Sequence, residues 1–107
     1  MIDAQIYKNT DGDVFSFEIQ NHGEPIVCAA VSALALNVIN SINSLTSFTT
    51  EDFTYEYEDD GYLYFEAYSH QNTTKEKNVA LLLNSFWLGI AGIYQSYPDQ
   101  IKLTVVD

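Results

Sequence analysis

The residue types best suited to chemistry lie together in one short segment, Asn21 to Cys28. The segment contains His22 and the single cysteine of the chain, Cys28. Pro25 suits the first position of a helix, where its missing N–H costs nothing. We therefore expect a helix to begin there and to carry Cys28 in its first turn. The positive end of the helix dipole favours the thiolate form of a cysteine at such a position.

His22 stands on the loop that leads into this helix, where it can take the thiol proton and later protonate a leaving amine. This is the base and nucleophile logic of a cysteine hydrolase, and backbone N–H groups of the first turn can stabilise an oxyanion. A plainer interpretation stays open, because a lone cysteine among apolar residues is commonly core filler. Ser32 follows Cys28 by one helical turn on the same face. Its hydroxyl either supports the site or bonds back to a carbonyl of its own helix.

Two strands are predicted before this segment. Residues 2–8 and 13–20 have strand-like sequences, with a cluster of turn residues between them. In the second strand, apolar side chains alternate with polar ones, which is the period of a half-buried strand. These apolar residues are Phe15, Phe17 and Ile19. The second strand therefore ends just before His22.

Two helices are predicted from apolar residues that recur at spacings of three and four. The first runs from Pro25 to about Leu45, and its stripe is Val27, Val31, Leu34, Val38, Ile42 and Leu45. The second begins near Thr73, which forms a capping box with Glu76, and it ends before Pro98. Its wider stripe contains Val79, Leu82, Leu83, Phe86, Ile90, Ile93, Tyr94 and Tyr97.

A hairpin of residues 53–58 and 62–68 lies between the helices, and its sequence indicates the register. A three-residue loop, Asp59-Asp60-Gly61 with Gly61 in the left-handed conformation, pairs Tyr57 with Leu63 and Tyr55 with Phe65. A two-residue loop would mix acidic and apolar side chains on one face, so the three-residue loop is predicted.

A last strand, 100–106, completes the element order ββαββαβ. This order predicts an α+β sandwich with an antiparallel-rich sheet and two helices. We expect a single domain over residues 1–107, because this length suffices for one hydrophobic core and not for two.

Charge and cysteine content exclude several functions. The formal net charge is −11, and the only basic side chains besides histidine are four lysines. Such a chain cannot build the basic patch that nucleic acids or anionic membranes require, so we expect neither partner. One cysteine excludes an internal disulfide framework and a zinc-ribbon site. The N-terminal residues lack the pattern of a signal peptide, which predicts a cytoplasmic protein.

The segment around Cys28 resembles the ribosomal-processing cysteine protease (Prp) family. That family has a Gly-His pair after the second strand and then Asp-Ile-Val-Cys-Ala-Ala-Val-Ser at a helix start. Here the match is His22 followed by Ile26-Val27-Cys28-Ala29-Ala30-Val31-Ser32, and it continues through residues 34–42. Asp60-Gly61-Tyr62-Leu63 is similar to the family's second hairpin turn.

The resemblance implies that Cys28 is the nucleophile, His22 the general base and Ser32 a supporting residue. It implies an endopeptidase without metal or cofactor that removes the short N-terminal extension of a large-subunit ribosomal protein, the one numbered twenty-seven. The resemblance also implies that cleavage follows an aromatic residue. The expected partners are that basic precursor and a second copy of the chain in a homodimer. The acidic surface would steer the basic substrate toward the site.

The chain departs from the family pattern near the site. Asn21 stands where the family has glycine, and Pro25 where it has aspartate; whether Glu24 replaces that carboxylate stays open. Only five residues separate His22 from Cys28, whereas the family has a longer, glycine-bearing loop thought to cover the substrate. A second hypothesis is therefore a catalytically impaired acidic module of the same fold that binds the basic ribosomal protein without cleaving it.

Other chemically capable residues are interpreted as structural. His70 lies in a polar loop and is expected to be solvated. The acidic residues at Asp59-Asp60 fit a turn better than a calcium loop. Tyr62 and Tyr64 lie among acids that would repel nucleic-acid phosphates, so they are candidates for a subunit interface.

Overall fold

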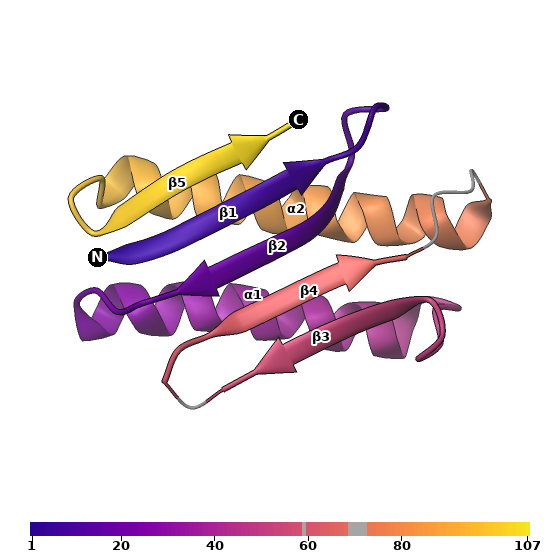
Figure 1. Cartoon of the computed structure of the whole chain (residues 1–107), viewed down its shortest axis with the longest axis horizontal. Coiled ribbons are helices and arrows are strands. Elements are labelled where there is room, and N and C mark those ends of the chain that lie inside the picture. Colours follow the sequence, from indigo (N-terminus) through magenta and orange to yellow (C-terminus); the bar gives the residue numbers. More distant parts are fainter. Residues whose placement is uncertain (59, 69–72) are drawn as a thin grey trace.

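The elements follow one another in the predicted order ββαββαβ. The structure is a computed structural model, and it describes residues 1–58, 60–68 and 73–107. The elements are β1 (Ile2–Lys8), β2 (Val14–Gln20), α1 (Pro25–Leu45), β3 (Phe53–Tyr57), β4 (Leu63–Ala67), α2 (Thr74–Ser96) and β5 (Ile101–Val106) (Figure 1). The α+β fold with two helices is confirmed.

The five strands form one sheet in the order β3-β4-β2-β1-β5. Neighbouring strands are antiparallel except β1 and β5, which run parallel (Figure 1). Ile19, near the end of β2, pairs with Leu63 at the start of β4. The end of β2 therefore lies beside the turn that joins β3 to β4.

The predicted hairpin register is confirmed. Tyr57 pairs with Leu63 and Tyr55 with Phe65, and Gly61 has a φ of 96°. A positive φ is open to glycine because it has no Cβ. Gly61 thus takes the left-handed conformation that the predicted register requires.

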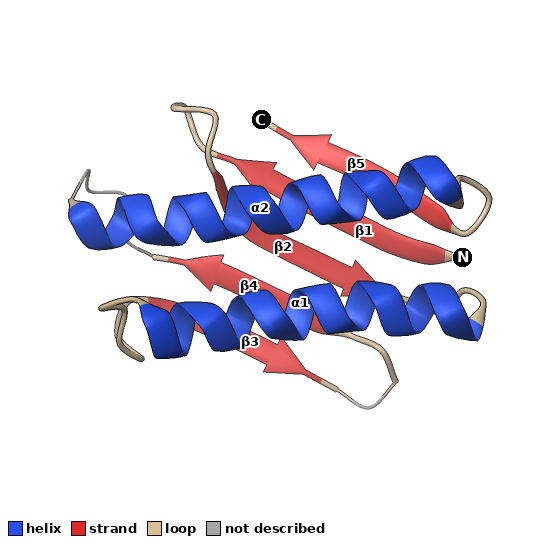
Figure 2. Cartoon of the chain, turned by 180° about the vertical axis from the view of Figure 1, so that it is seen from behind, coloured by secondary structure: helices blue, strands red, loops and turns tan. Residues whose placement is uncertain are grey.

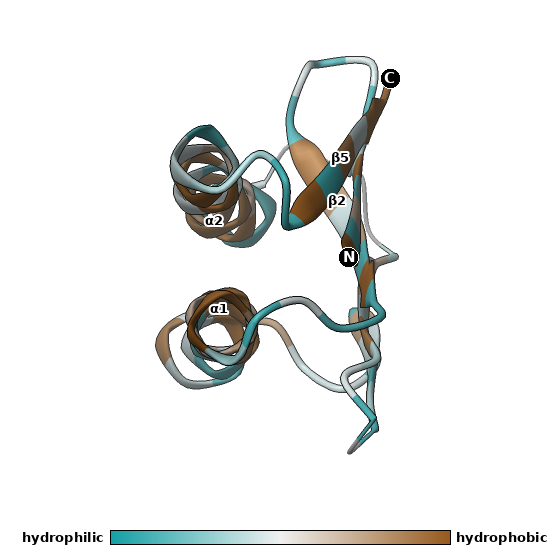
Figure 3. Cartoon of the chain, turned by 90° about the vertical axis from the view of Figure 1, so that its left-hand side faces the viewer, coloured by the Kyte–Doolittle hydropathy of each residue, from teal (hydrophilic) through white to brown (hydrophobic). Residues whose placement is uncertain are grey.

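Both helices cover the same face of the sheet and leave the other face uncovered (Figures 2 and 3). The core between the layers is rich in aromatic rings. Phe17 stacks on Phe65 of the neighbouring strand with ring centroids 5.8 Å apart, and its ring is tilted against that of Phe86 of α2 with centroids 4.3 Å apart. All three side chains are buried.

The helix boundaries agree with their sequence signals. Pro25 is the first residue of α1, and the expected capping box of Thr73 and Glu76 is present at the start of α2, with the N–H of Thr73 donating to Glu76 Oε1 at 3.2 Å. By length and hydropathy alone, either helix is long and apolar enough to cross a membrane. Each lies with one apolar face on the sheet (Figure 3).

The predicted apolar stripes extend too far toward the helix ends. Leu45 is 75% exposed, Tyr94 38% and Tyr97 43%. Each lies beyond the last buried residue of its helix, Ile42 in α1 and Ile90 in α2. Periodicity marks the face of a helix, whereas the extent of the sheet decides where burial ends.

Candidate active site

The loop between β2 and α1 begins with a residue in the left-handed conformation, directly before His22. Asn21, the first residue after β2, has a φ of 69°, in the left-handed region. Among residues with a side chain, asparagine is one of the few that adopt this region routinely. The sharp change of direction at Asn21 brings the chain from the sheet toward the helix layer and leaves His22 exposed.

Cys28 lies in the first turn of α1, as predicted. Its own N–H donates to the carbonyl of Glu24 at 2.9 Å, which is the first hydrogen bond of the helix. The N–H groups of Ile26 and Val27 precede that bond and therefore have no acceptor within the helix. Free N–H groups at the start of a helix can bind an anionic oxygen.

The sulfur of Cys28 contacts both backbone polar groups of Gly23. The Gly23 N–H donates to Sγ at 3.1 Å, and Sγ lies 3.4 Å from the Gly23 carbonyl oxygen. The first contact suits a thiolate, because an N–H donor stabilises negative charge on sulfur. The second suits a thiol, whose S–H can donate to the carbonyl. Gly23 can thus form a hydrogen bond with the sulfur whether it is a thiol or a thiolate.

Gln100, just before β5, ties this loop to the sheet. Its side-chain Oε1 accepts the N–H of Glu24 at 2.8 Å, and its backbone carbonyl accepts the N–H of Ile2 at 2.8 Å. Glu24 is the N-cap residue of α1, and its exposed carboxylate makes no capping hydrogen bond. The loop between β2 and α1 is therefore anchored by a residue near the C-terminal end of the chain.

The structure brings His22, Cys28 and Ser32 to one small cavity of about 20 Å³, which Gly61 and apolar side chains complete. Within the described residues, no hydrogen bond joins the side chains of His22 and Cys28. In that same part of the chain the Ser32 hydroxyl makes no hydrogen bond back to its own helix. The predicted site residues therefore converge, with the sulfur held by Gly23 rather than by the imidazole.

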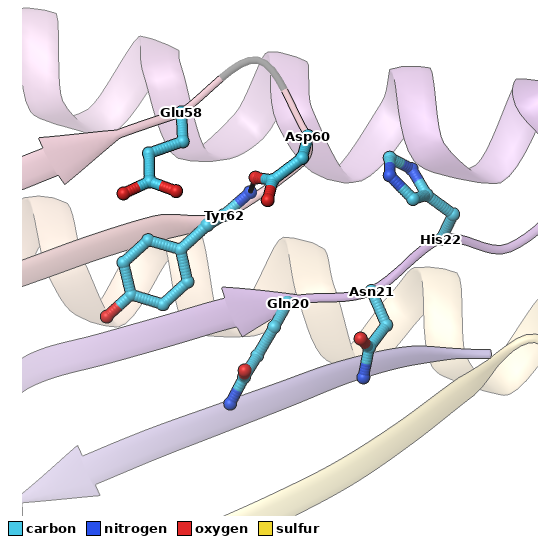
Figure 4. A pocket seen from close by; sticks show the side chains of 6 residues that line it. All are labelled: Gln20, Asn21, His22, Glu58, Asp60 and Tyr62. Atoms are coloured by element: carbon cyan, nitrogen blue, oxygen red, sulfur yellow. Dashed lines mark hydrogen bonds between the residues drawn. The ribbon is translucent and has the colours of Figure 1, made fainter.

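A larger, acidic hollow of about 320 Å³ opens on the other side of His22. Its lining is Gln20 at the end of β2, Asn21 and His22 directly after it, and Glu58, Asp60 and Tyr62 of the hairpin (Figure 4). The Asp60 carboxylate accepts the N–H of Tyr62 at 3.2 Å. His22 thus stands between the cysteine cavity and an open, negatively charged surface.

The uncovered sheet face next to this hollow carries tyrosines paired with carboxylates. The Tyr62 hydroxyl donates to Glu18 at 2.8 Å, and this hydrogen bond raises the pKa of Tyr62 to about 12. Burial, followed by a hydrogen bond to Glu66 at 2.6 Å, raises the pKa of Tyr64 to about 12. Both phenols therefore stay neutral donors at ordinary pH. His70 and Asp59 lie outside the described residues.

Residues 1–102 match the family model for the cysteine protease Prp. The chain belongs to this family. It is 29% identical to the ribosomal processing cysteine protease Prp of Bacillus subtilis, over 97% of this chain and 96% of that one. The predicted membership and the predicted enzyme class, a cysteine protease, are confirmed.

Several solved structures share this fold over nearly the whole chain. The essential ribosomal processing protease Prp of S. aureus, with a covalently linked product peptide, has a TM-score of 0.84 at 26% identity and covers 98% of this chain and 99% of its own. The same protease with a substrate peptide has a TM-score of 0.81, also at 26% identity, with the same coverage of both chains. A protein from Streptococcus mutans is 30% identical, with a TM-score of 0.78, and covers 99% of this chain and 94% of its own.

Three residues of the site were missed by reasoning from the sequence. Gly23 contacts the sulfur through its backbone, Gln100 anchors the loop, and Gly61 lies against His22. The only available signal was the left-handed turn at Gly61, which indicated a conformation and not a neighbour. Gln100 carried no signal, because a glutamine before a strand is an ordinary surface residue.

Proposed function

We propose that the chain is an endopeptidase that removes the short N-terminal extension of a large-subunit ribosomal protein, the one numbered twenty-seven, by cutting after an aromatic residue. Cys28 is the nucleophile and His22 the general base. The observation that carries the proposal is the shared cavity, which a first-turn cysteine and the histidine of the preceding loop both line. The family and the substrate peptide bound by its S. aureus member support it.

The first half of the reaction forms an acyl-enzyme. His22 takes the thiol proton, and Sγ attacks the carbonyl carbon of the scissile peptide bond. The carbonyl electron pair moves to oxygen, where the N–H groups of Ile26 and Val27 stabilise the charge. The protonated imidazole then gives its proton to the leaving amine as the C–N bond breaks. A thioester on Cys28 remains.

The second half returns the enzyme to its starting state. His22 takes a proton from water, the hydroxide attacks the thioester carbonyl, and the C–S bond breaks to release the extension. The sulfur leaves as a thiolate, to which the N–H of Gly23 donates in the observed structure. His22 then returns its proton to the sulfur, and the released extension carries the new carboxylate. Proton transfer requires His22 and Cys28 to close to hydrogen-bond distance, and such contacts tighten on substrate binding in many enzymes.

Ser32 and the acidic surface have supporting roles in this proposal. Ser32 lies one turn below Cys28 in the same cavity, where its hydroxyl can donate to a sulfur or oxygen that carries charge. The acids at the hollow, with a net charge of −11 for the chain, favour the basic sequence of a protein that binds ribosomal RNA. We propose that the enzyme meets this precursor in the cytoplasm.

The test is cleavage of a peptide that carries the precursor's N-terminal sequence, followed by mass spectrometry. We expect the native chain to cut it once and Cys28→Ala to leave it intact, because no acyl-enzyme can form. His22→Ala should lower kcat by about 10²–10⁴-fold, the usual contribution of a general base. The chain's other histidine provides a matched control, and His70→Ala should cleave at the native rate.

Binding of the peptide by the native chain without cleavage would contradict the proposal and favour the non-catalytic binding module. Equal cleavage by the native chain and by Cys28→Ala would show that a different residue is the nucleophile.

We also propose that the chain forms the homodimer that the family resemblance implies. An apolar stripe on the outer face of α2 supports an apolar contact, because Leu81 and Leu88 are each 70% exposed and two turns apart. Exposed apolar patches on a folded protein commonly mark an interface.

Light scattering after size-exclusion chromatography tests the dimer. The native chain is expected at twice the monomer mass, with Leu88→Glu shifted toward the monomer. Leu45→Glu is the control, because Leu45 is 75% exposed at the end of the other helix. A native monomer, or equal effects of the two substitutions, would exclude this interface.

A further inference from the structure

The turn between β3 and β4 touches the ring of His22 at a glycine. A Cβ at Gly61 would lie 2.8 Å from Cε1 of His22, 3.3 Å from Nδ1 and 3.4 Å from Nε2. Real Cβ atoms essentially never approach another heavy atom as closely as 2.8 Å. The imidazole therefore occupies the space into which the Cβ of any other residue at position 61 would extend.

The turn that presents Gly61 is held by hydrogen bonds on both sides. The Gly61 N–H donates to the Glu58 carbonyl at 3.1 Å, and the Glu58 N–H donates to the Tyr62 carbonyl at 2.9 Å. The backbone of Gly61 cannot simply retreat from an added Cβ without breaking these bonds. The exposed imidazole, which borders the open hollow of Figure 4, is the part that must move.

We propose that Gly61 is a positioning residue for His22. The bare backbone of the turn forms the wall against which the imidazole rests, and this wall keeps the ring at the cavity it shares with Cys28. A side chain at position 61 displaces the ring into the acidic hollow and away from the sulfur. The inference rests on the proposed role of His22 as the general base.

The kinetic test compares Gly61→Ala and Gly61→Asn with the same substitutions at Gly12. Gly12 also lies in a hairpin turn with a positive φ, 83°, but a Cβ there meets nothing within 4 Å. Both sites therefore carry backbone strain, and only position 61 carries the clash. Asparagine tolerates the left-handed region better than alanine does, so it relieves the strain and keeps the Cβ.

We expect both Gly61 variants to lose kcat by about 10²-fold with little change in KM, as for a misplaced catalytic group. Both Gly12 variants should keep the native kcat. The Cε1–H NMR resonance of His22 should shift in the Gly61 variants and not in the Gly12 variants. Native kcat and an unshifted resonance in folded Gly61→Asn would overturn the proposal, as would an equal kcat loss at Gly12.

A double-mutant cycle on stability tests the contact without any substrate. Gly61→Ala should destabilise the chain less in a His22→Ala background than in the native one, because the truncated residue no longer occupies the space. Gly12→Ala should cost the same in both backgrounds. If Gly61→Ala is too unstable to measure, Gly61→Asn replaces it in the cycle.

These readouts separate the inference from the proposed function. A native chain that cleaves nothing, combined with positive coupling between positions 61 and 22, would reject the protease proposal and keep the contact. Active Gly61 variants without coupling would reject the positioning role and leave the protease proposal intact.

Discussion

At the scale of single residues, the backbone conformation of Asn21 sets the direction in which the chain leaves β2 and reaches His22. Its φ of 69° turns the chain out of β2 directly before His22. The family pattern has glycine at this position, and asparagine is among the best replacements for glycine where φ is positive. The asparagine that this chain has at position 21 therefore suits the conformation observed there.

This conformation predicts a specific pattern of stability. Asn21→Gly should leave the free energy of unfolding nearly unchanged, whereas Asn21→Ala should lower it by about 1 kcal/mol, because alanine is strained in the left-handed region. Urea unfolding followed by circular dichroism measures both. Equal stability of the alanine and glycine variants would show that residue 21 is not held in this conformation.

The sequence predicts those parts of the site that depend on local signals. Pro25 marked the start of α1 and so placed Cys28 in the first turn. Alternation in the hairpin gave both its register and the left-handed Gly61. In each case a few neighbouring residues determine the structure.

The remaining parts depend on contacts between residues distant in the chain. Gln100 reaches Glu24 across 76 positions, and Gly61 meets His22 because β4 pairs with β2. Periodicity reports which face of an element is buried and does not report which element lies beside it. For the same reason, the parallel pairing of β5 with β1 was not predicted.

At the scale of elements, the connection from α1 to β3 is fixed by one carboxylate. The N–H of Thr49 donates to Asp52 Oδ2 at 2.7 Å, and Lys75 of α2 forms an ion pair with Oδ1 at 3.2 Å. The hydrogen bond from Thr49, helped by Lys75, lowers the pKa of Asp52 below its ordinary value of 3.8. This carboxylate ties the start of the edge hairpin to α2.

The lowered pKa predicts how stability depends on pH. A group with a lowered pKa in the folded state stabilises the fold above its ordinary pKa, and this contribution is lost as the pH falls through the folded value. Asp52→Asn should therefore be less stable than the native chain at pH 7. The difference should shrink below pH 3.8.

Thermal unfolding at several pH values measures this difference. Glu51→Gln, at the exposed neighbouring position, is the control, and it should show no such convergence with the native chain. A difference between the native chain and Asp52→Asn that persists unchanged into acid would contradict the role of the carboxylate.

At the scale of the whole molecule, charge is distributed over a two-layer fold with one open sheet face. The helices cover one face (Figure 3), and the other carries carboxylates that hold tyrosine hydroxyls, such as Glu18 with Tyr62 and Glu66 with Tyr64. The acidic hollow beside His22 continues this surface. A basic substrate would therefore approach the site along a surface of opposite charge.

This charge predicts a dependence of the rate on salt. For a peptide with several lysines after the cleavage site, kcat/KM should fall by about tenfold between low and high ionic strength, because salt screens long-range steering. A peptide of the same length with glutamine in place of lysine should show little change. Equal salt dependence of the two peptides would exclude steering by the acidic surface.

The place of β3 at the edge of the sheet has a consequence for the temperature range of activity. β3 pairs with β4 alone, and elements at an edge open locally at lower free energy than the centre of a fold. The turn at Gly61 belongs to this hairpin, so local fraying would remove the surface against which His22 rests. We therefore expect catalysis to fail on heating before the fold melts, which makes the working range of the enzyme narrower than its folded range.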